Sequence, residues 1–178
     1  MARNLTSDAF PAPRHNHAAC VDDAIRSARE AFKRYGMPFT LLREKVLREI
    51  AGSHKAVTAY EVLNGLAIKG TQMPPTSIYR IINALVDAGV VRRFESRNAY
   101  YASHSNDPMS PRIVLACEIC GWVADADGVP TFRGIRRAFE RRAFSARTAI
   151  MEVLGVCAHC AQSNRGSDCA STARQSAG

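Results

Sequence analysis

The sequence has 178 residues, of which 47% are hydrophobic, 22% charged and 7% aromatic, a length that suits one moderate domain or two small ones. Its 24 basic residues outnumber its 16 acidic ones and give a formal charge of +8, which is compatible with a polyanionic partner but does not prove one. No apolar run approaches the roughly 18–20 residues that cross a bilayer, and the N-terminus lacks the apolar middle of a signal peptide. We therefore expect a cytoplasmic protein without a membrane partner, whose thiols stay reduced.

The first third of the chain predicts an arm followed by three helices. Residues 1–20 are polar, contain two prolines and indicate a flexible N-terminal arm. Apolar residues then recur at helical spacing from 21 to about 35. Thr40 is placed to cap a second helix that stops at Gly52. The sequence TAYE at 58–61 has the capping-box pattern, which predicts the start of a third helix.

A fourth helix and a hairpin complete this half. In SIYRIINALVDAG, residues 77–89, the apolar side chains form one continuous helical stripe. Two extended segments follow, 90–94 and 99–103, and the four residues ESRN between them suit a hairpin turn. Helices followed by a basic hairpin are the order of a winged helix-turn-helix. We assign residues 21–104 to this DNA-binding domain.

The second half predicts a smaller α+β unit. Residues 105–111 are rich in turn formers and indicate a hinge. Within 112–162, the segments IVLA and WVADA read as short strands, PTFRGIRRAFERRAF (130–144) as a helix, and TAIMEVL (148–154) as a third strand. Residues 163–178 are dominated by small polar side chains, which predicts a disordered tail.

Two CxxC motifs bracket this unit and predict a metal cage. Gly121 follows the first motif and permits a tight knuckle, and 36 residues separate the two motifs. Four thiolates satisfy Zn²⁺ at tetrahedral positions and leave no coordination site for water or substrate. A redox dithiol or incidental core cysteines are the alternatives; paired motifs around a small fold favour structural zinc, one per chain. The predicted ligands are Cys117, Cys120, Cys157 and Cys160.

An enzyme is not indicated. The sequence lacks the H-x-E of zinc deaminases, and it has no HExxH, GxxxxGK[ST] or GxSxG. With only five histidines and a metal cage that is closed to water, no residue set suggests catalysis or a small-molecule substrate.

The fourth helix is the predicted DNA reader. An amphipathic helix is often only a solvated helix, but this one follows a capped helix and precedes an arginine-bearing hairpin. Residues near the N-terminus of such a helix meet base edges. Arg80 suits bidentate contact with guanine, and Tyr79 suits a thymine methyl or a phosphate. Arg92 and Arg93 of the hairpin are more plausible as phosphate contacts.

Taken together, the motifs TAYE, PPTSIYRIINALVDAGVVRRFES, CEICG and GVCAHC, in this order, resemble the ferric uptake regulator (Fur) superfamily, closest to its zinc uptake regulator branch. The resemblance runs from about residue 22 to residue 160. It implies a homodimeric, metal-responsive repressor with an N-terminal winged helix and a C-terminal α+β dimerisation domain that holds a zinc ion on four cysteines. By this resemblance Tyr60, Ser77, Tyr79 and Arg80 fall on DNA-contacting positions.

The regulatory metal site of the family matches poorly. Arg92 stands where the zinc branch has a histidine, and Ser103 stands where it has a cysteine. Only His104 and Asp125 remain as family-type ligands, and Zn²⁺ prefers imidazole and thiolate, so such a site should be weak. The possible helpers are Asp107, Asp127 and Glu152.

Three explanations for this mismatch stay open. The sensor has decayed and left a constitutive DNA binder, the protein responds to another effector, or a rearranged site uses His104 with carboxylates. A variant of the last explanation recruits His15, His17 and Cys20 from the arm. In a flexible arm, however, such ligand types at close spacing are more often incidental.

The sequence therefore predicts an α+β protein that binds a double-stranded DNA operator as a homodimer and represses metal-homeostasis genes. It predicts a structural zinc and a degenerate regulatory metal site. The alternative is a zinc-stabilised basic module that binds nucleic acid non-specifically, or an acidic protein, without responding to metal.

Overall fold

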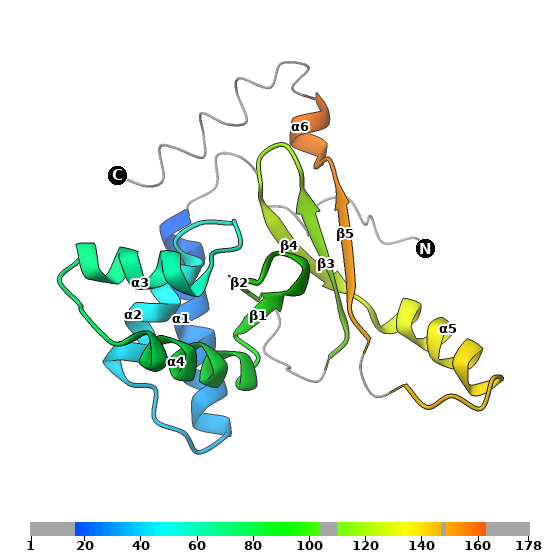
Figure 1. The fold of residues 1–178 in the computed structure, drawn as a ribbon, viewed down its shortest axis with the longest axis horizontal. Coiled ribbons are helices and arrows are strands. Elements are labelled where there is room, and N and C mark those ends of the chain that lie inside the picture. The colour runs from blue at the N-terminus through cyan, green and yellow to red at the C-terminus, as the bar shows by residue number, and fades with distance from the viewer. Residues whose placement is uncertain (1–16, 104–109, 147–148, 163–178) are drawn as a thin grey trace.

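The computed structural model describes residues 17–103, 110–146 and 149–162 (Figure 1). Four helices pack together on one side of the molecule, a two-stranded hairpin lies in the middle, and a three-stranded sheet lies on the other side. The helices are α1 His17–Arg34, α2 Leu41–Ala51, α3 Ala59–Ile68 and α4 Pro75–Asp87.

The predicted helix starts are present. The Thr40 hydroxyl accepts a hydrogen bond from the amide of Arg43 at 3.3 Å and caps α2. At α3 the capping box is complete, because the Thr58 hydroxyl accepts from the Glu61 amide at 3.2 Å while the Glu61 carboxylate accepts from the Thr58 amide at 2.6 Å. α4 begins at Pro75, two residues before the predicted start, since proline fits the first turn of a helix.

The first helix corrects one predicted boundary. α1 begins at His17, so residues 17–20 are helical although the sequence assigned them to the arm. Ala18 and Ala19 are strong helix formers, which explains why the helix extends beyond its apolar stripe. Farther along α1, Ala28 and Phe32 are fully buried against the other helices.

The hairpin forms the wing as predicted. β1 Val91–Phe94 pairs antiparallel with β2 Ala99–Ala102, and a short 3-10 helix, η1 Glu95–Arg97, connects them. Asn98 closes the turn in the left-handed region with a φ of 46°, a conformation that asparagine tolerates better than most residues.

The second half is the predicted small α+β unit. Its sheet has the order β4-β3-β5, with β3 antiparallel to β4 and parallel to β5. α5 lies on the crossover between β4 and β5 and ends four residues before its predicted end, and α6 directly after β5 was not predicted. The bounds are β3 Arg112–Cys117, β4 Val123–Asp127, α5 Val129–Glu140, β5 Met151–Gly155 and α6 Ala158–Gln162.

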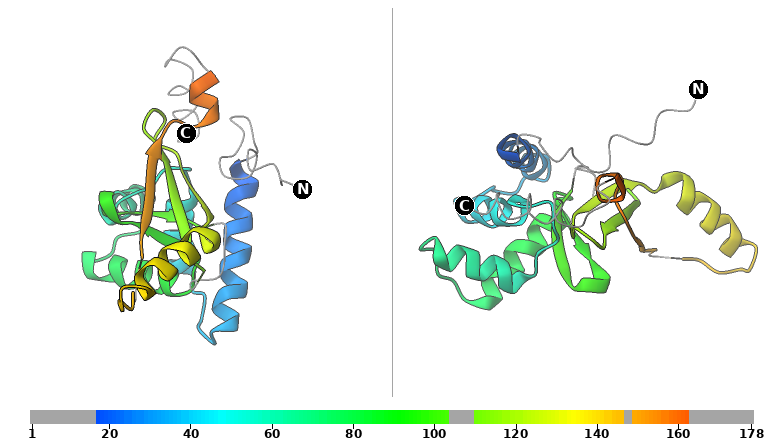
Figure 2. Two further views of the ribbon diagram at one scale, coloured as in Figure 1. Left: turned by 90° about the vertical axis from the view of Figure 1, so that its right-hand side faces the viewer. Right: turned by 90° about the horizontal axis from the view of Figure 1, so that it is seen from above.

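Three hydrophobic clusters stabilise this arrangement. The largest lies among α1–α4 and includes Leu47, Ile82 and Leu85, all fully buried. The second joins the wing to the sheet, because Phe94 and Tyr101 pack with Val114, Ala116 and Val123. The third contains the four cysteines with Trp122 against them. The wing therefore packs on the C-terminal sheet as well as on its own helices (Figure 2).

Candidate metal centres and nucleic-acid interface

The four predicted zinc ligands converge at the end of the sheet. Cys117 ends β3, Cys120 follows in the knuckle, Cys157 follows β5, and Cys160 lies in α6. All four are buried, and their Sγ atoms lie within 4.8 Å of one another, with 4.0 Å between those of Cys120 and Cys157. Tetrahedral zinc with Zn–S bonds of about 2.3 Å places its sulfurs about 3.8 Å apart. The donor set and its spacing therefore fit a structural zinc ion.

The backbone supports this cage. Gly121 has a φ of 75°, which a residue with a Cβ rarely adopts, and its amide bonds the Cys117 carbonyl at 2.9 Å to close the knuckle. The amide of Cys157 donates to the Cys117 Sγ, and the amide of Cys160 donates to the Cys157 Sγ, each at 3.4 Å. Burial raises the pKa of Cys117, but backbone amides that include those of Cys157, Cys120 and Ile119 outweigh this and lower the pKa to about 6. At Cys117, therefore, amide groups aimed at the sulfur favour the thiolate that a metal needs.

An ionic network occupies the region where the resemblance places the regulatory metal. The Asp125 carboxylate on β4 accepts from the Arg112 Nε at 2.9 Å and from the Ser103 hydroxyl at 3.1 Å. The Nε of Arg92 on β1 lies 3.9 Å from this carboxylate and donates to the Ser103 hydroxyl at 3.2 Å. Arg92 also donates to the backbone carbonyl of Ser110 at 3.3 Å. The network therefore ties β1, through Arg92, and the residue after β2, Ser103, to β3 and β4.

Two predicted roles change as a result. Arg92 as a phosphate contact is not supported by this conformation, because its guanidinium points inward and its side chain is only 18% exposed. Asp125 as a weak metal ligand is also not supported, since two guanidinium groups already neutralise its fully buried carboxylate and would repel a cation. Its proposed partner His104, like Asp107, lies outside the described residues.

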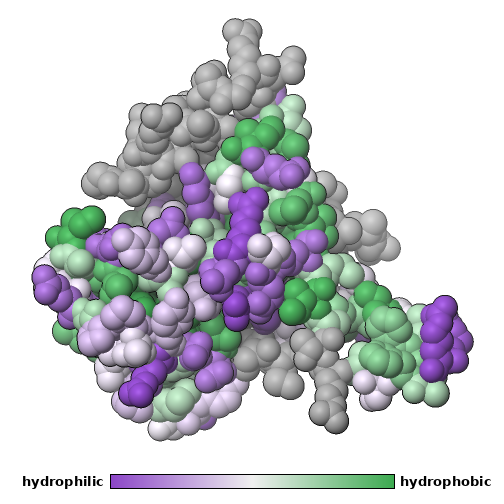
Figure 3. Space-filling view, viewed as in Figure 1, coloured by the Kyte–Doolittle hydropathy of each residue, from purple (hydrophilic) through white to green (hydrophobic). Residues whose placement is uncertain are grey.

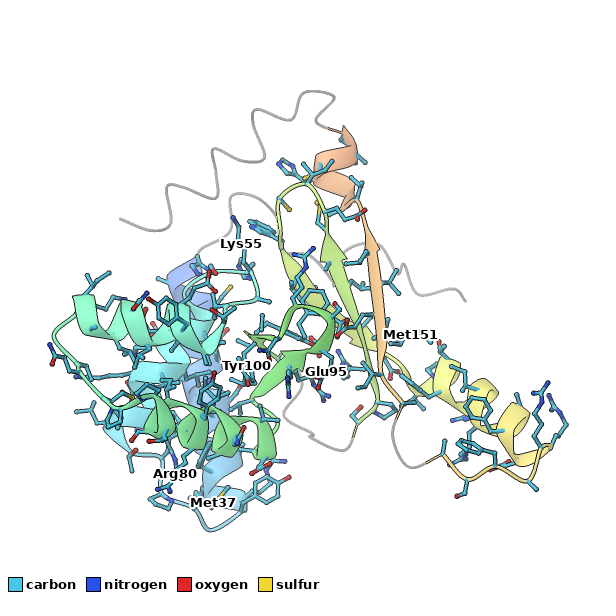
Figure 4. All side chains as sticks on the ribbon, in the orientation of Figure 1. Met37, Lys55, Arg80, Glu95, Tyr100 and Met151 are labelled. Atoms are coloured by element: carbon cyan, nitrogen blue, oxygen red, sulfur yellow. The ribbon has the colours of Figure 1, made fainter. Side chains whose placement is uncertain are left out.

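The other two possible helpers are engaged as well. Glu152 on β5 accepts hydrogen bonds from the backbone amides of Glu95 and Ser96, at 2.6 and 3.2 Å, and so attaches the wing tip to the sheet. Glu95 and Met151 accordingly lie near each other in Figure 4. Asp127 accepts from the amide of Val129 at 3.0 Å at the start of α5. Neither carboxylate faces a cluster of metal-binding side chains in the described part of the chain.

The predicted DNA-reading residues lie on the helical side. α4 buries Ile78, Ile82 and Leu85 and exposes Tyr79 and Arg80 on its N-terminal half. Figure 4 shows Arg80 at the edge of the helical domain, pointing away from it.

The remaining predicted contacts differ in exposure. Ser77 is half-buried in the first turn of α4, and Tyr60 at the start of α3 is 70% exposed. Arg93 is exposed on β1, where it donates to the Asn98 side chain at 2.8 Å and pairs with Glu95 at 3.1 Å. Of the two wing arginines predicted as contacts, only Arg93 faces solvent.

One further group was predicted only in part, since the sequence offers His17 and Cys20 as possible ligands but does not indicate His54. His17 and Cys20 on α1 lie beside His54 in the loop between α2 and α3, with their ligand atoms within 4.8 Å of one another. The segment HNHAAC signals two of these residues, but His54 is a single histidine with no motif around it. Only the packing of α1 against this loop brings the three together.

A winged helix joined to a small sheet that ends in a four-cysteine cage defines a class of metal-linked DNA-binding proteins. The family model described as "Ferric uptake regulator family" matches residues 34–154. The chain belongs to this family. In addition, no helix within the described residues is long and apolar enough to cross a membrane.

Individual relatives agree with this assignment. The chain is 28% identical over 145 residues to the zinc uptake regulation protein of Escherichia coli K12, and the aligned region covers 80% of this chain and 84% of that protein. It is 26% identical over 141 residues to the peroxide-responsive repressor PerR of Staphylococcus aureus, and the aligned region covers 79% of this chain and 90% of that protein.

Two solved structures share the fold. The holo form of the regulator XcZur is 27% identical, with a TM-score of 0.71 over 80% of this chain and 99% of that one. A zinc uptake regulator in complex with zinc and DNA has a TM-score of 0.73 at 24% identity, over 80% and 96%.

Proposed function

We propose that this protein is a homodimeric, sequence-specific DNA-binding regulator that represses metal-homeostasis genes and contains a structural zinc ion. The observation that carries the proposal is the geometry of α4, whose apolar face lies in the core while Tyr79 and Arg80 face outward from its N-terminal half. A helix in a winged helix-turn-helix reads bases with these positions. Membership in the ferric uptake regulator family and the names of its relatives support the same function.

DNA contact divides into reading and positioning. Arg80 is proposed to pair with a guanine edge, and Tyr79 to touch a thymine methyl or a phosphate. Tyr60, Ser77 and Arg93 are proposed to hold phosphates, which sets the register of the protein on the duplex. Arg92 is left out of this set because it is bound within the hinge network.

The exposed side of the C-terminal unit supports the dimer. β5 is an edge strand of its sheet, and Val153 and Leu154 on it are 46% and 50% exposed. No residue of α5, Val129–Glu140, is buried, although Phe132, Ile135 and Phe139 lie on one face of this helix. Figure 3 shows hydrophobic surface over β5 and α5. An edge strand and an unburied apolar helix face are features that a second copy covers.

The proposed organisation follows from these roles. With the start moved to the first residue of α1, residues 17–104 form the proposed DNA-binding domain, 105–111 the hinge and 112–162 the dimerisation domain, and the protein is proposed to work in the cytoplasm. No catalytic activity is proposed, since the four-cysteine cage has no open coordination position. The family-type regulatory site is degenerate, because Arg92 supplies a fixed positive charge where the family has a metal ligand.

Substitution of Arg80 tests base reading. The operator is first selected from a random duplex library, and binding of the native protein and Arg80→Ala is then compared on operator and scrambled duplexes at one salt concentration. We expect Arg80→Ala to lose about 1–3 kcal/mol on the operator and to bind scrambled DNA almost as before. Arg137→Ala, on α5, is the matched control and should leave both affinities unchanged.

The same experiment separates the alternative function. A zinc-stabilised basic module would bind every duplex through phosphates alone. In that case Arg80→Ala would weaken binding equally on operator and scrambled DNA, or the selection would recover no preferred sequence. Either result would refute the sequence-specific regulator.

A further inference from the structure

A second group of metal-binding side chains lies at the N-terminal end of α1, outside the four-cysteine cage. His17 and Cys20 come from the first turn of this helix, and His54 comes from the loop between α2 and α3. All three are half-buried, and their ligand atoms lie within 4.8 Å of one another. The Nδ1 of His17 and the Nε2 of His54 are 3.1 Å apart.

The fold fixes these residues from both sides. His17 and Cys20 are three residues apart on a helix, a spacing that places their side chains on the same face. The backbone carbonyl of His54 accepts from the Val123 amide at 2.7 Å, and its ring centroid lies 5.1 Å from that of Trp122. A β-bridge between Lys55 and Trp122 holds the loop against the C-terminal sheet. Contacts with Trp122 and with Val123 on β4 therefore hold His54 in place, in addition to contacts within its own domain.

The distances and the ligand types suit a borderline-soft metal ion. In a tetrahedral zinc site, Zn–N bonds are about 2.0 Å and Zn–S bonds about 2.3 Å long. Neighbouring ligand atoms are then about 3.3–3.6 Å apart. The pair of nitrogens is already close to this spacing, and the Cys20 Sγ lies within 4.8 Å of a ring nitrogen of each histidine. Two imidazoles and one thiolate are ligands that Zn²⁺ prefers over carboxylates.

We propose that His17, Cys20 and His54 form a second, exchangeable zinc site, and that this site regulates the protein. The regulatory part rests on the proposed DNA-binding function, whereas the zinc site itself does not.

Three protein ligands leave one coordination position for water. A cavity of about 190 Å³ lies beside the site and is lined in part by Cys20, Asp23 and His54. It is large enough for a zinc-bound water, and its lining includes polar side chains. An open three-ligand site should bind zinc less tightly than the closed four-thiolate cage, as sensing requires an ion that exchanges.

The position of the site explains how zinc would act on DNA binding. α1 and the loop with His54 belong to the helical domain, while Trp122 and Val123 belong to the first knuckle and to the strand β4 that follows it. An ion between α1 and this loop would fix the end of α1 where the two halves meet. A ligand that binds one relative arrangement of the two halves more tightly than another shifts the equilibrium between them toward the first. Zinc would favour the arrangement described here.

Metal uptake tests the site without DNA. Protein with the cysteine cage filled with zinc is titrated with Co²⁺, and zinc affinity is then measured by competition with a chromophoric chelator. We expect the native protein to take up one additional ion per chain, with a sulfur-to-cobalt charge-transfer band from Cys20. Cys20→Ser should lose this band, and both Cys20→Ser and His54→Ala should weaken the additional zinc at least tenfold.

Controls separate loss of the site from loss of the fold. Cys169→Ser removes a thiol that is not among the proposed ligands and should keep the additional ion. Each variant should retain its cage zinc and its thermal unfolding midpoint. Cys20→His should restore zinc binding without the charge-transfer band, which a purely structural role for Cys20 would not produce. If Cys20→Ser binds the additional ion as tightly as the native protein, or if the native protein takes up none, the site is refuted.

Operator binding tests the regulatory part. Saturating the second site should raise operator affinity at least tenfold in the native protein and change it little in Cys20→Ser. Equal operator affinity with and without the additional zinc would overturn regulation through this site. Failure of all preparations to select an operator would instead refute the proposed function, while the ion uptake would still establish the metal site.

Discussion

Replacing Asp125 with asparagine removes one buried negative charge and keeps the size of the side chain. In the native protein this carboxylate is 0% exposed and faces two guanidinium groups, at 2.9 Å from the Arg112 Nε and 3.9 Å from the Arg92 Nε. At an effective dielectric constant near 20, each attraction is worth roughly 4–6 kcal/mol before desolvation is counted. In the intact network the cost of desolvating the charges cancels much of this attraction. When the carboxylate is lost, the arginines remain desolvated and their desolvation cost is still present.

The expected loss of stability comes mainly from Arg92 and Arg112, which stay largely buried without a negatively charged partner. Removing one partner of a buried ion pair typically costs about 3–5 kcal/mol, and the asparagine oxygen still accepts hydrogen bonds. We expect Asp125→Asn to lower the free energy of unfolding by about 3 kcal/mol, at the lower end of that range. For a chain of this length that is a fall in the unfolding midpoint of roughly 6–12 °C.

Thermal and urea unfolding of the zinc-loaded protein, at one protein concentration, measures this loss. Glu140→Gln is the matched control, because Glu140 pairs with Arg136 at 3.5 Å where both side chains are more than half exposed. An exposed pair contributes less than about 1 kcal/mol. A loss for Asp125→Asn no larger than that of the control would show that the network does not hold the wing to the sheet.

Two more changes address the metal chemistry. Cys157→Ser should lose the cage zinc and unfold the C-terminal unit, since structural zinc binding is coupled to folding; zinc content and Trp122 fluorescence report this, and an unchanged dimer with unchanged melting would contradict a structural role. The double variant Arg92→His, Ser103→Cys should gain one zinc per chain beside Asp125, because it restores the ligand types that the resemblance places there. Chelator competition counts the ions, and an unchanged count would show that this part of the hinge is not a converted metal site.

Local patterns were sufficient for most of the fold. The capping box at Thr58 and Glu61 depends on residues three apart, and the stripe of α4 depends on helical period, so both could be predicted without knowing any distant contact. The cysteine cage was predictable for a similar reason. Each CxxC motif fixes two ligands within one turn, and a closed four-thiolate site needs only that the two motifs meet.

Short helices and helix ends are set partly by packing, which local patterns do not contain. α6 consists of five residues inside the second knuckle and has no periodic pattern long enough to detect. The residues of the first turn of α1 are mostly polar or small and give no apolar stripe, so the sequence predicts an arm there; the helix propensity of Ala18 and Ala19 explains the extra turn.

Local sequence patterns were enough to predict the class of this protein, a winged helix with an outward-facing Arg80 followed by an α+β unit held together by zinc. Tertiary packing, by contrast, sets the partners of Arg92 and His54, which no local pattern predicts. It turns Arg92 toward Asp125 on another strand, and it places His54 against His17 and Cys20 on α1. Neither contact has a local signature, because each joins single side chains that are far apart in the sequence. The first forms when the wing packs on the C-terminal sheet, and the second forms when α1 packs against the loop between α2 and α3.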